Sequence, residues 1–206
     1  MARLDLEGLG FGKTEVLGRL SIDVEQGETL AILGPSGIGK TSLLRIFAGL
    51  ETGYRGKLQI TSRLAFVFQE PTLLPWRKAI CNITLATGCT RDVAANWLDR
   101  VGIAQCAELF PGQMSLGQQR RLSLARAFAS KPELLLMDEP FVSLDPQLVD
   151  EMLGVFEALR AEENTTTLFV THAETEATRL ASRIIRLGGK PATIKSESRE
   201  TMGSST

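Results

Sequence analysis

The sequence predicts an α/β fold, in which a mostly parallel β-sheet carries helices on its faces and a helical subdomain is inserted into the chain. The buried strand Thr29–Leu33 runs into a glycine-rich loop and then into the helical pattern Lys40–Leu50. Farther along, the apolar strands Leu134–Met137 and Thr167–Thr171 alternate with the helical stretch Pro146–Glu162, as strands and helices do in parallel sheets. Between these two halves, helical patterns replace strands and indicate the insertion.

The remaining elements complete this arrangement. Leu20–Val24 alternates apolar and polar residues, which is typical of a half-buried strand, and we expect a small antiparallel β region near the N-terminus. Leu64–Gln69 is a further apolar strand. The helical patterns of the inserted region are Ile80–Ala86, Arg91–Val101 and Leu116–Ala129.

These patterns predict one domain, with an α/β core made of residues 1–69 and 131–194 and a helical subdomain at residues 70–130. The tail, Lys195–Thr206, is rich in Ser, Thr and Glu and poor in apolar residues. Because such a segment buries little apolar surface, we expect it to be disordered.

Composition narrows the class of protein. Apolar residues make up 43% and charged residues 23% of the 206 residues, as in ordinary globular proteins. The net charge of −1 provides no basic field for nucleic acid. No signal-peptide pattern and no apolar run of about 18 residues is present, so we expect a cytoplasmic protein. The three cysteines show no metal-ligand spacing and are interpreted as reduced thiols.

A phosphate-binding loop follows the strand Thr29–Leu33. Residues 34–41 fit the pattern G-x-x-x-x-G-K-[ST] between a strand and a helix. Glycines let several backbone N–H groups point at one phosphate, and the helix adds its positive N-terminal end. Lys40 supplies a charge to the β- and γ-phosphates, and the Thr41 hydroxyl is placed to bind Mg²⁺. The residues predicted to hold the nucleotide are Gly34, Pro35, Ser36, Gly37, Ile38, Gly39, Lys40 and Thr41.

Two acids end the strand that begins at Leu134. In open α/β sheets, chemistry gathers at the carboxyl ends of the strands. We therefore expect Asp138 beside the phosphate loop, where it holds Mg²⁺ directly or through water. Glu139, the next residue, faces another direction and is placed to polarise a water that attacks the γ-phosphate. Together with the loop, this pair predicts a P-loop NTPase core that hydrolyses a nucleoside triphosphate.

With these motifs in place, the sequence resembles the nucleotide-binding domain of ABC transporters from Leu4 to about Leu187. Residues 114–119, Met-Ser-Leu-Gly-Gln-Gln, resemble the family's signature motif, usually written LSGGQ. The other matching features, in the family's order, are the aromatic Phe11, the Q-loop residue Gln69, the end of the Walker B motif Asp138-Glu139-Pro140, the D-loop Ser143-Leu144-Asp145 and the switch histidine His172.

The resemblance implies a role for each matching residue. Glu139, His172, Lys40 and Gln69 are implied to be catalytic, and Thr41, Gln69 and Asp138 to bind Mg²⁺. Phe11 is implied to stack on adenine, with Thr14 beside it. The residues implied to meet ATP held by a second copy of the chain are Ser115, Gly117, Gln118 and Asp145.

Several of these residues also fit a purely structural role. Ser115 and Asp145 suit the N-caps of the helices that follow them. Phe11 suits a core or loop aromatic, His172 a structural histidine and Gln69 a buried structural glutamine. Leu116 replaces the first glycine of the signature motif, which weakens the grip on phosphate unless its side chain points away. We favour the second arrangement, because Ser115 and Gly117 are retained.

The resemblance also implies partners. They are a second copy of the chain in an ATP-sandwich dimer, transmembrane permease subunits and an extracytoplasmic solute-binding protein, with no nucleic acid. The segment Gln69–Arg77 is apolar and contains Trp76, so it fits either a permease interface or the packing of the helical subdomain. The runs Phe68-Gln69-Glu70, Leu74-Pro75-Trp76 and Asn82-Ile83 are similar to those of nitrate, sulfonate and taurine importer ATPases, and thiamine-precursor importers look alike too. This resemblance implies a peripheral place on the inner face of the membrane.

Two other functions remain open at this stage. One is an ABC ATPase of DNA repair or translation, although the chain has neither the coiled-coil insert nor the paired cassettes usual in such proteins. The other is a nucleotide-binding regulatory module without turnover, which the presence of Glu139 and His172 disfavours.

Overall fold

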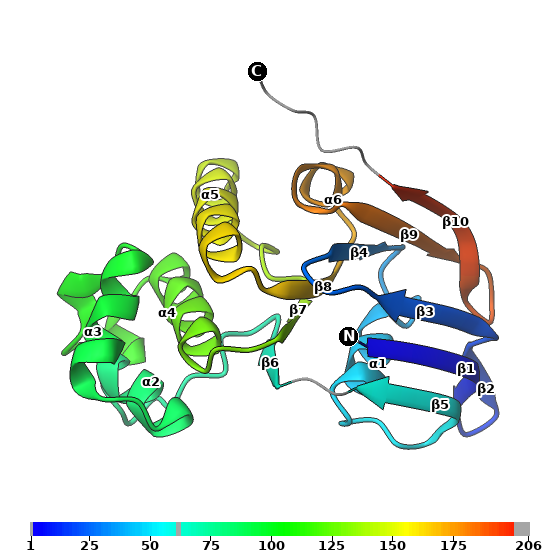
Figure 1. Cartoon of the computed structure of the whole chain (residues 1–206), viewed down its shortest axis with the longest axis horizontal. Helices are drawn as coiled ribbons and strands as arrows, with labels where there is room; N and C mark the ends of the chain where they lie inside the picture. Colours follow the sequence, from blue (N-terminus) through cyan, green and yellow to red (C-terminus); the bar gives the residue numbers. More distant parts are fainter. Residues whose placement is uncertain (1, 61–62, 200–206) are drawn as a thin grey trace. The chain divides into compact units, whose positions relative to one another are not determined.

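The computed structural model describes residues 2–60 and 63–199, and these form two compact units. Unit 1 contains the N-terminal part of the chain up to Leu64, together with Glu133–Glu139 and the residues from Thr165 onward. Unit 2 contains Ala65–Pro132 and Pro140–Asn164. In Figure 1, unit 1 holds most of the strands and unit 2 holds the helices α2 to α5.

Unit 1 is built on a largely parallel sheet. Its strands lie in the order β10-β9-β4-β8-β7, with β4 parallel to β8 and β9, and β7 parallel to β8. Every residue of β4, β7 and β8 is buried, as expected for strands covered on both faces. The strands are β4 (Thr29–Leu33), β7 (Leu134–Asp138), β8 (Thr166–Thr171), β9 (Arg183–Gly188) and β10 (Thr193–Arg199).

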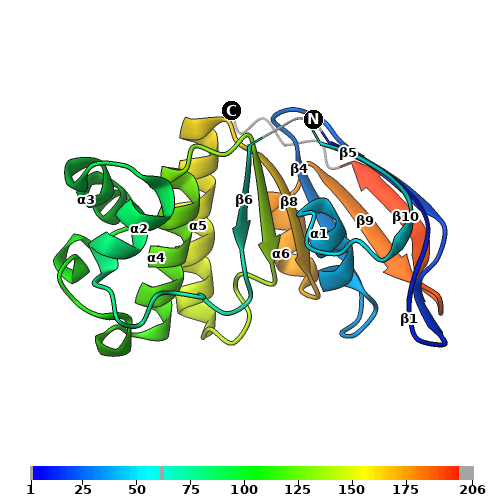
Figure 2. The same ribbon diagram turned by 90° about the horizontal axis from the view of Figure 1, so that it is seen from below.

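A second, antiparallel layer in unit 1 is made by the N-terminal strands. In it, β1 pairs with β2, β3 and β5. Helix α1 (Lys40–Phe47) contacts β5 as well as β7 and β8, and Figure 2 shows it between the two layers. Helix α6 (Glu174–Leu180) lies on the other side of β4. The strands of this layer are β1 (Ala2–Phe11), β2 (Thr14–Leu17), β3 (Leu20–Val24) and β5 (Tyr54–Ile60).

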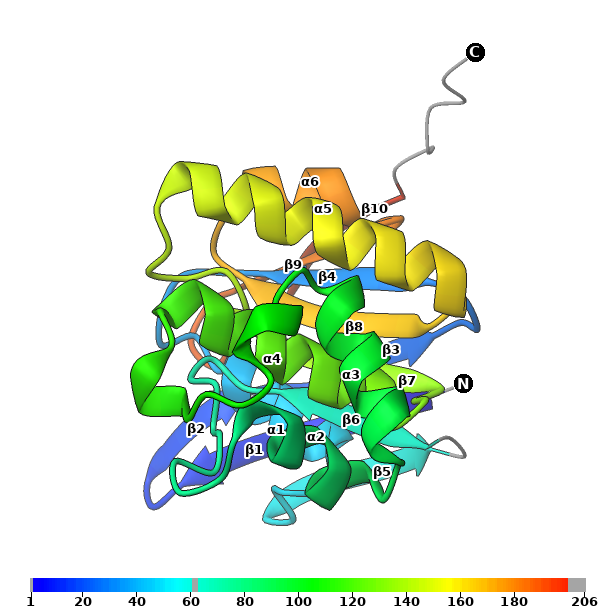
Figure 3. The ribbon, with the colours of Figure 1, turned by 90° about the vertical axis from the view of Figure 1, so that its left-hand side faces the viewer.

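The helices of unit 2 pack together (Figure 3). An aromatic cluster lies between them. The Phe128 ring lies 6.0 Å from the Trp97 ring and 6.4 Å from the Phe156 ring, between centroids. These three side chains come from different helices and are almost completely buried. The elements of this region are β6 (Leu64–Val67), which crosses into it from unit 1, α2 (Ala79–Thr87), α3 (Arg91–Arg100), α4 (Leu116–Ala129) and α5 (Pro146–Glu163).

The predicted fold class is confirmed, and two details of the expected organisation differ. Helix α5 groups with unit 2 and not with the α/β core, because Phe156 packs on Phe128 and Glu151 pairs with Arg121 of α4 at 2.9 Å. The prediction of a disordered tail is wrong for residues 195–199, which belong to β10 and pair with β9. Residues 200–206 lie outside the described part of the chain.

Composition misled the prediction for the tail because an edge strand needs no apolar side chains. β10 is held by its backbone bonds to β9 and by side-chain bonds from Arg183 to Glu197 and from Arg186 to Ser198.

Among residues 2–60 and 63–199, no helix has the length and apolar character needed to cross a bilayer.

We predict that Phe128→Ala lowers the free energy of unfolding by about 3–5 kcal/mol, because it removes the central ring of a buried cluster and leaves a cavity. Denaturant unfolding measures this change. Phe110→Ala is the matched control, since Phe110 is 40% exposed and its loss is expected to change stability by less than about 1 kcal/mol. Equal losses in the two variants would contradict the packing described for unit 2.

Candidate functional site

The ends of three neighbouring strands bring the predicted residues of unit 1 together. In the parallel register, Leu33 of β4 pairs with Thr171 of β8, and Asp138 of β7 pairs with Val170 of β8. The phosphate loop therefore begins beside the residues that follow β8 and β7. This is the edge of a parallel sheet at which ligands bind.

The loop conformation depends on glycine at two positions. Gly37 and Gly39 have φ values of 75° and 107°, which L-residues with side chains adopt only with strain. A Cβ at Gly39 would also lie 2.8 Å from the Leu17 side chain. Helix α1 begins at Lys40 without a capping side chain, so its first N–H groups remain available to an anion.

Lys40 is buried and makes three polar contacts within the site. Its Nζ donates to the carbonyl oxygens of Gly34 at 2.9 Å and Pro35 at 3.2 Å. The third contact is an ion pair with Glu139 Oε1 at 3.1 Å. A phosphate group that binds this ammonium therefore replaces at least one of these acceptors, and Glu139 is released when its own contact is replaced.

Thr41 and Asp138 form a pair of hard oxygen ligands. The Thr41 hydroxyl donates to Asp138 Oδ1 at 3.0 Å, and Asp138 is 5% exposed. Burial raises the pKa of Asp138, the nearby Glu139 charge adds to this rise, and the Thr41 hydrogen bond and the Lys40 charge oppose it. One carboxylate and one hydroxyl beside a phosphate loop fit Mg²⁺, which takes few protein ligands together with phosphate oxygens. No cluster of three or more His, Cys, Asp or Glu side chains able to hold a metal occurs within residues 2–60 and 63–199.

Glu139 turns away from β7 and meets His172. Its φ of 43° is unusual for a residue with a side chain, and its N–H donates to Val170 O at 3.0 Å. The carboxylate contacts His172 Nδ1 through Oε2 at 3.2 Å and Lys40 through Oε1. The arrangement places one carboxylate between a cation and an imidazole at the sheet edge, where it can accept a proton from a water held by either neighbour.

Phe11 and Thr14 lie at the β1–β2 hairpin of unit 1. They pair with each other across the turn formed by Gly12 and Lys13. Phe11 is 51% exposed, so the alternative of a core aromatic is wrong. Its free ring face is available for stacking on a planar ligand.

The signature residues of unit 2 begin helix α4 with a reciprocal cap. The Ser115 hydroxyl accepts from Gln118 N–H at 3.2 Å, and Gln118 Oε1 accepts from Ser115 N–H at 2.9 Å. Gly117 is buried, and a Cβ there would lie 2.6 Å from the Leu148 side chain of α5. Leu116 is 43% exposed. The expected N-cap role of Ser115 is confirmed.

The segment before α5 is held by a buried arginine that the sequence analysis missed. Arg120, in α4, donates to the carbonyl oxygens of Pro140 and Val142 and is 7% exposed. Asp145 Oδ1 accepts from Leu148 N–H at 3.0 Å, which confirms its N-cap role. No motif identifies Arg120, because its partners are backbone groups 20 and 22 residues away.

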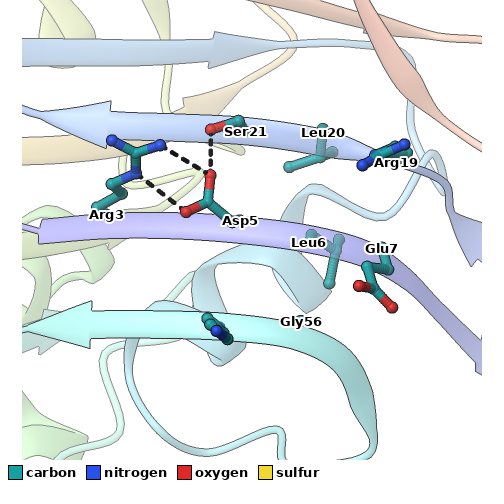
Figure 4. Close-up of a pocket in the computed structure, with 9 residues that line it drawn as sticks. Arg3, Asp5, Leu6, Glu7, Arg19, Leu20, Ser21 and Gly56 are labelled. Atoms are coloured by element: carbon teal, nitrogen blue, oxygen red, sulfur yellow. Dashed lines mark hydrogen bonds and ion pairs between the residues drawn. The ribbon is translucent and has the colours of Figure 1, made fainter.

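The other predicted residue of unit 2 is Gln69, which is exposed and follows β6. Figure 4 shows a different feature, a depression on the antiparallel layer of unit 1. Two of its charged side chains already bond each other, since Arg3 pairs with Asp5 at 3.0 Å, and Ser21 donates to the same carboxylate at 2.6 Å. None of the predicted nucleotide residues lines it.

Comparison with known proteins assigns the chain to a family. The family model described as ABC transporter matches residues 17–142, which include the phosphate loop, the signature motif and both acids. This chain belongs to the ABC transporter family. Within that family it is the ATP-binding and ATP-hydrolysing subunit of a transporter.

The similar curated proteins are named as ATP-binding proteins of aliphatic sulfonate import. The chain is 44% identical over 179 residues to the aliphatic sulfonates import ATP-binding protein SsuB of Granulibacter bethesdensis, covering 86% of this chain and 75% of that protein. It is 41% identical to SsuB 1 of Rhodococcus jostii over 192 residues, covering 89% and 78%.

A solved structure described as a dimeric, post-hydrolysis state of an ATP-binding cassette bound to ADP and Pi has the same fold. It superimposes with a TM-score of 0.85 at 27% identity, covering 97% of this chain and 98% of that chain.

We predict that Asp138→Asn stabilises this ABC ATPase in the absence of nucleotide and metal. In the folded state the pKa of Asp138 is raised, so the penalty of ionising it is absent below its ordinary pKa of about 3.9 and grows as the pH rises. The variant is therefore expected to unfold at a higher temperature at pH 8, by about 2–4 °C for each kcal/mol gained, and at nearly the wild-type temperature at pH 4. Calorimetry with a chelator present measures both values, and a lower unfolding temperature at pH 8 would contradict the argument.

Proposed function

We propose that two copies of this chain hydrolyse ATP with Mg²⁺ at composite sites and so drive a solute importer. The observation that carries the proposal is the triad of contacts at the edge of the sheet, in which Glu139 lies between Lys40 and His172. Phosphoryl transfer to water uses a cation that binds the phosphate and a carboxylate that polarises the water. An imidazole can orient the water and the carboxylate.

Within one chain, each predicted site residue has a proposed task. Lys40 and the loop N–H groups hold the β- and γ-phosphates, and Phe11 stacks on the adenine, with Thr14 beside it. Thr41 and Asp138 hold Mg²⁺, with Gln69 as a further ligand, and the ion neutralises charge on the phosphates when bound. Glu139 accepts a proton from the attacking water, and His172 orients that water and the carboxylate.

The second copy completes the site. Ser115, Gly117 and Gln118 lie at the N-terminus of α4, where backbone N–H groups and the helix dipole favour an anion. We assign this end to the γ-phosphate held by the other copy, and Asp145 to the dimer interface. The dimeric cassette with ADP and Pi supports this reading, because its fold matches nearly the whole chain.

Coupling to membrane partners is assigned to exposed apolar side chains of unit 2. Trp76 is 68% exposed and Leu85 is 58% exposed, so the alternative that Trp76 fills the core of the helical subdomain has no support. In the same unit, Arg126 of α4 donates to Thr72 O at 2.9 Å and Pro71 O at 3.1 Å. These bonds tie the segment that contains Trp76 to the helix that begins with the signature motif.

The proposed cargo is a small organic anion of the sulfonate class, delivered by an extracytoplasmic solute-binding protein to permease subunits. The curated relatives are named as aliphatic sulfonate import proteins, which supports import as the direction of transport and sulfonates as the class of cargo. The chain would then work on the inner face of the membrane, held there by the permease.

We predict that Glu139→Gln lowers kcat for ATP hydrolysis at least 100-fold and preserves ATP binding, because it removes the proton acceptor and keeps the shape of the site. The variant is expected to accumulate as a dimer with ATP. Phosphate release, fluorescent ATP binding and light scattering measure the three effects.

Glu133→Gln is the matched control for that variant. Glu133 lies at the other end of β7, is exposed and pairs with Arg63 at 3.5 Å, so its loss is expected to leave kcat unchanged. Turnover at the wild-type rate in Glu139→Gln would refute the proposed mechanism.

We predict that Trp76→Ser weakens binding to the cognate permease subunits at least 10-fold and changes the ATPase rate of the isolated chain less than about 2-fold, since exposed aromatic anchors dominate interfaces. Co-purification from membranes in detergent measures binding. Leu50→Ser is the control, because Leu50 is 60% exposed in unit 1. Unchanged permease binding in Trp76→Ser would remove this surface from the proposal.

A further inference from the structure

A buried hydrogen-bonded pair lies directly behind His172. Thr171 ends β8 and is 2% exposed, and Glu176 lies in the first turn of α6 and is 8% exposed. The Thr171 hydroxyl donates to Glu176 Oε2 at 2.5 Å and accepts from Ala173 N–H at 3.0 Å. Both neighbours of His172 in the chain are therefore held through one hydroxyl group.

Glu176 has no part in the proposed chemistry. Its carboxyl group is nevertheless buried, which costs free energy when the group is ionised. Burial raises the pKa of Glu176, and the Thr171 hydrogen bond and the His172 charge oppose that rise. The Glu139 charge adds to it. A buried carboxyl group needs a hydrogen bond to offset the loss of hydration. The loss of the Thr171 contact would therefore leave the Glu176 carboxyl group buried without that partner.

The turn matters because the contact between His172 Nδ1 and Glu139 Oε2 at 3.2 Å depends on the direction from which the imidazole arrives. The His172 side chain is 52% exposed, so packing restrains it weakly, and its direction depends on the backbone that carries it. A threonine that accepts from the N–H two residues later closes a local turn. This turn sits where β8 leaves the sheet, and it sets the direction from which His172 reaches Glu139.

We propose that Glu176 is a positioning residue for His172: its carboxyl group, acting through the Thr171 hydroxyl, fixes the turn that places the imidazole against Glu139. The inference rests on the proposed function, in which His172 and Glu139 act on ATP and water. It adds a buried residue on α6 to a site otherwise built from the ends of β4, β7 and β8.

The kinetic test removes or keeps the hydrogen bond at each end. Glu176→Met and Thr171→Val lose it, and each is expected to lower kcat about 10-fold with KM within about 2-fold of wild type. Glu176→Gln and Thr171→Ser keep an acceptor and a hydroxyl, so they are expected to stay within about 3-fold of the wild-type kcat. Glu174→Gln is the control on the same helix, because Glu174 is exposed and pairs with Arg186.

A second test separates positioning from general stability. In a chain that already carries His172→Ala, Glu176→Met is expected to cause no further loss of kcat, because the residue acts through the missing imidazole. The same 10-fold loss in both backgrounds would overturn the proposal. Thermal unfolding of each variant shows which ones remain folded at the assay temperature.

The third test observes the imidazole directly. His172 is the only histidine of the chain, so a protein without a histidine tag gives one set of ring signals in NMR. Glu176→Met and Thr171→Val are expected to shift these signals in the nucleotide-free protein, and Glu174→Gln to leave them in place. Unchanged signals together with wild-type kcat in Glu176→Met would overturn the proposal.

These results also distinguish failure of the inference from failure of the proposed function. If Glu139→Gln hydrolyses ATP at the wild-type rate, the proposed function fails, and the NMR shifts still report whether Glu176 positions His172. If Glu139→Gln and His172→Ala both lose activity and Glu176→Met does not, only the inference about Glu176 fails.

Discussion

The parallel register of three strands is the constraint on which the site depends. Because Leu33 pairs with Thr171, the phosphate loop and His172 leave the sheet side by side, and Glu139 follows β7 on the next strand along. Parallel strands present their carboxyl ends at one edge, so residues more than a hundred positions apart become neighbours. The hydrogen bonds of this buried sheet therefore set the spacing between the phosphate-binding and water-activating groups. Such bonds break only when the whole core unfolds.

The same arrangement concentrates unfavourable interactions at that edge. Asp138 is buried next to a second carboxylate, and Glu139 adopts a backbone conformation that residues with side chains rarely occupy. Lys40 and Thr41 offset part of the electrostatic cost, yet the raised pKa of Asp138 shows that burial outweighs them. A site held in this way favours an incoming cation, since a cation relieves the carboxylate charge that the protein alone leaves poorly compensated.

The sequence predicted those parts of the site whose residues are close in the chain. The loop at residues 34–41, the acids after β7 and the cap at Ser115 follow from local spacing. Contacts across the chain were not predictable, because no pattern announces that Arg120 will reach the carbonyl oxygens of Pro140 and Val142. The polar strand β10 was missed for a related reason: backbone groups at the edge of β9 pair with any extended segment, whatever its side chains.

The signature motif shows how one substitution can be tolerated. Its two glycine positions are under different constraints, because Gly117 is buried and an added Cβ would lie 2.6 Å from the Leu148 side chain of α5, whereas Leu116 is 43% exposed. Packing between α4 and α5 therefore favours glycine at position 117 independently of any ligand, because a larger residue requires the Leu148 side chain to shift. Residue 116 is exposed, so a leucine there leaves the helix and its cap intact. Retention of glycine at 117 is thus weaker evidence for phosphate binding than its place in the motif implies, and the burden falls on Ser115 and the first N–H groups of α4.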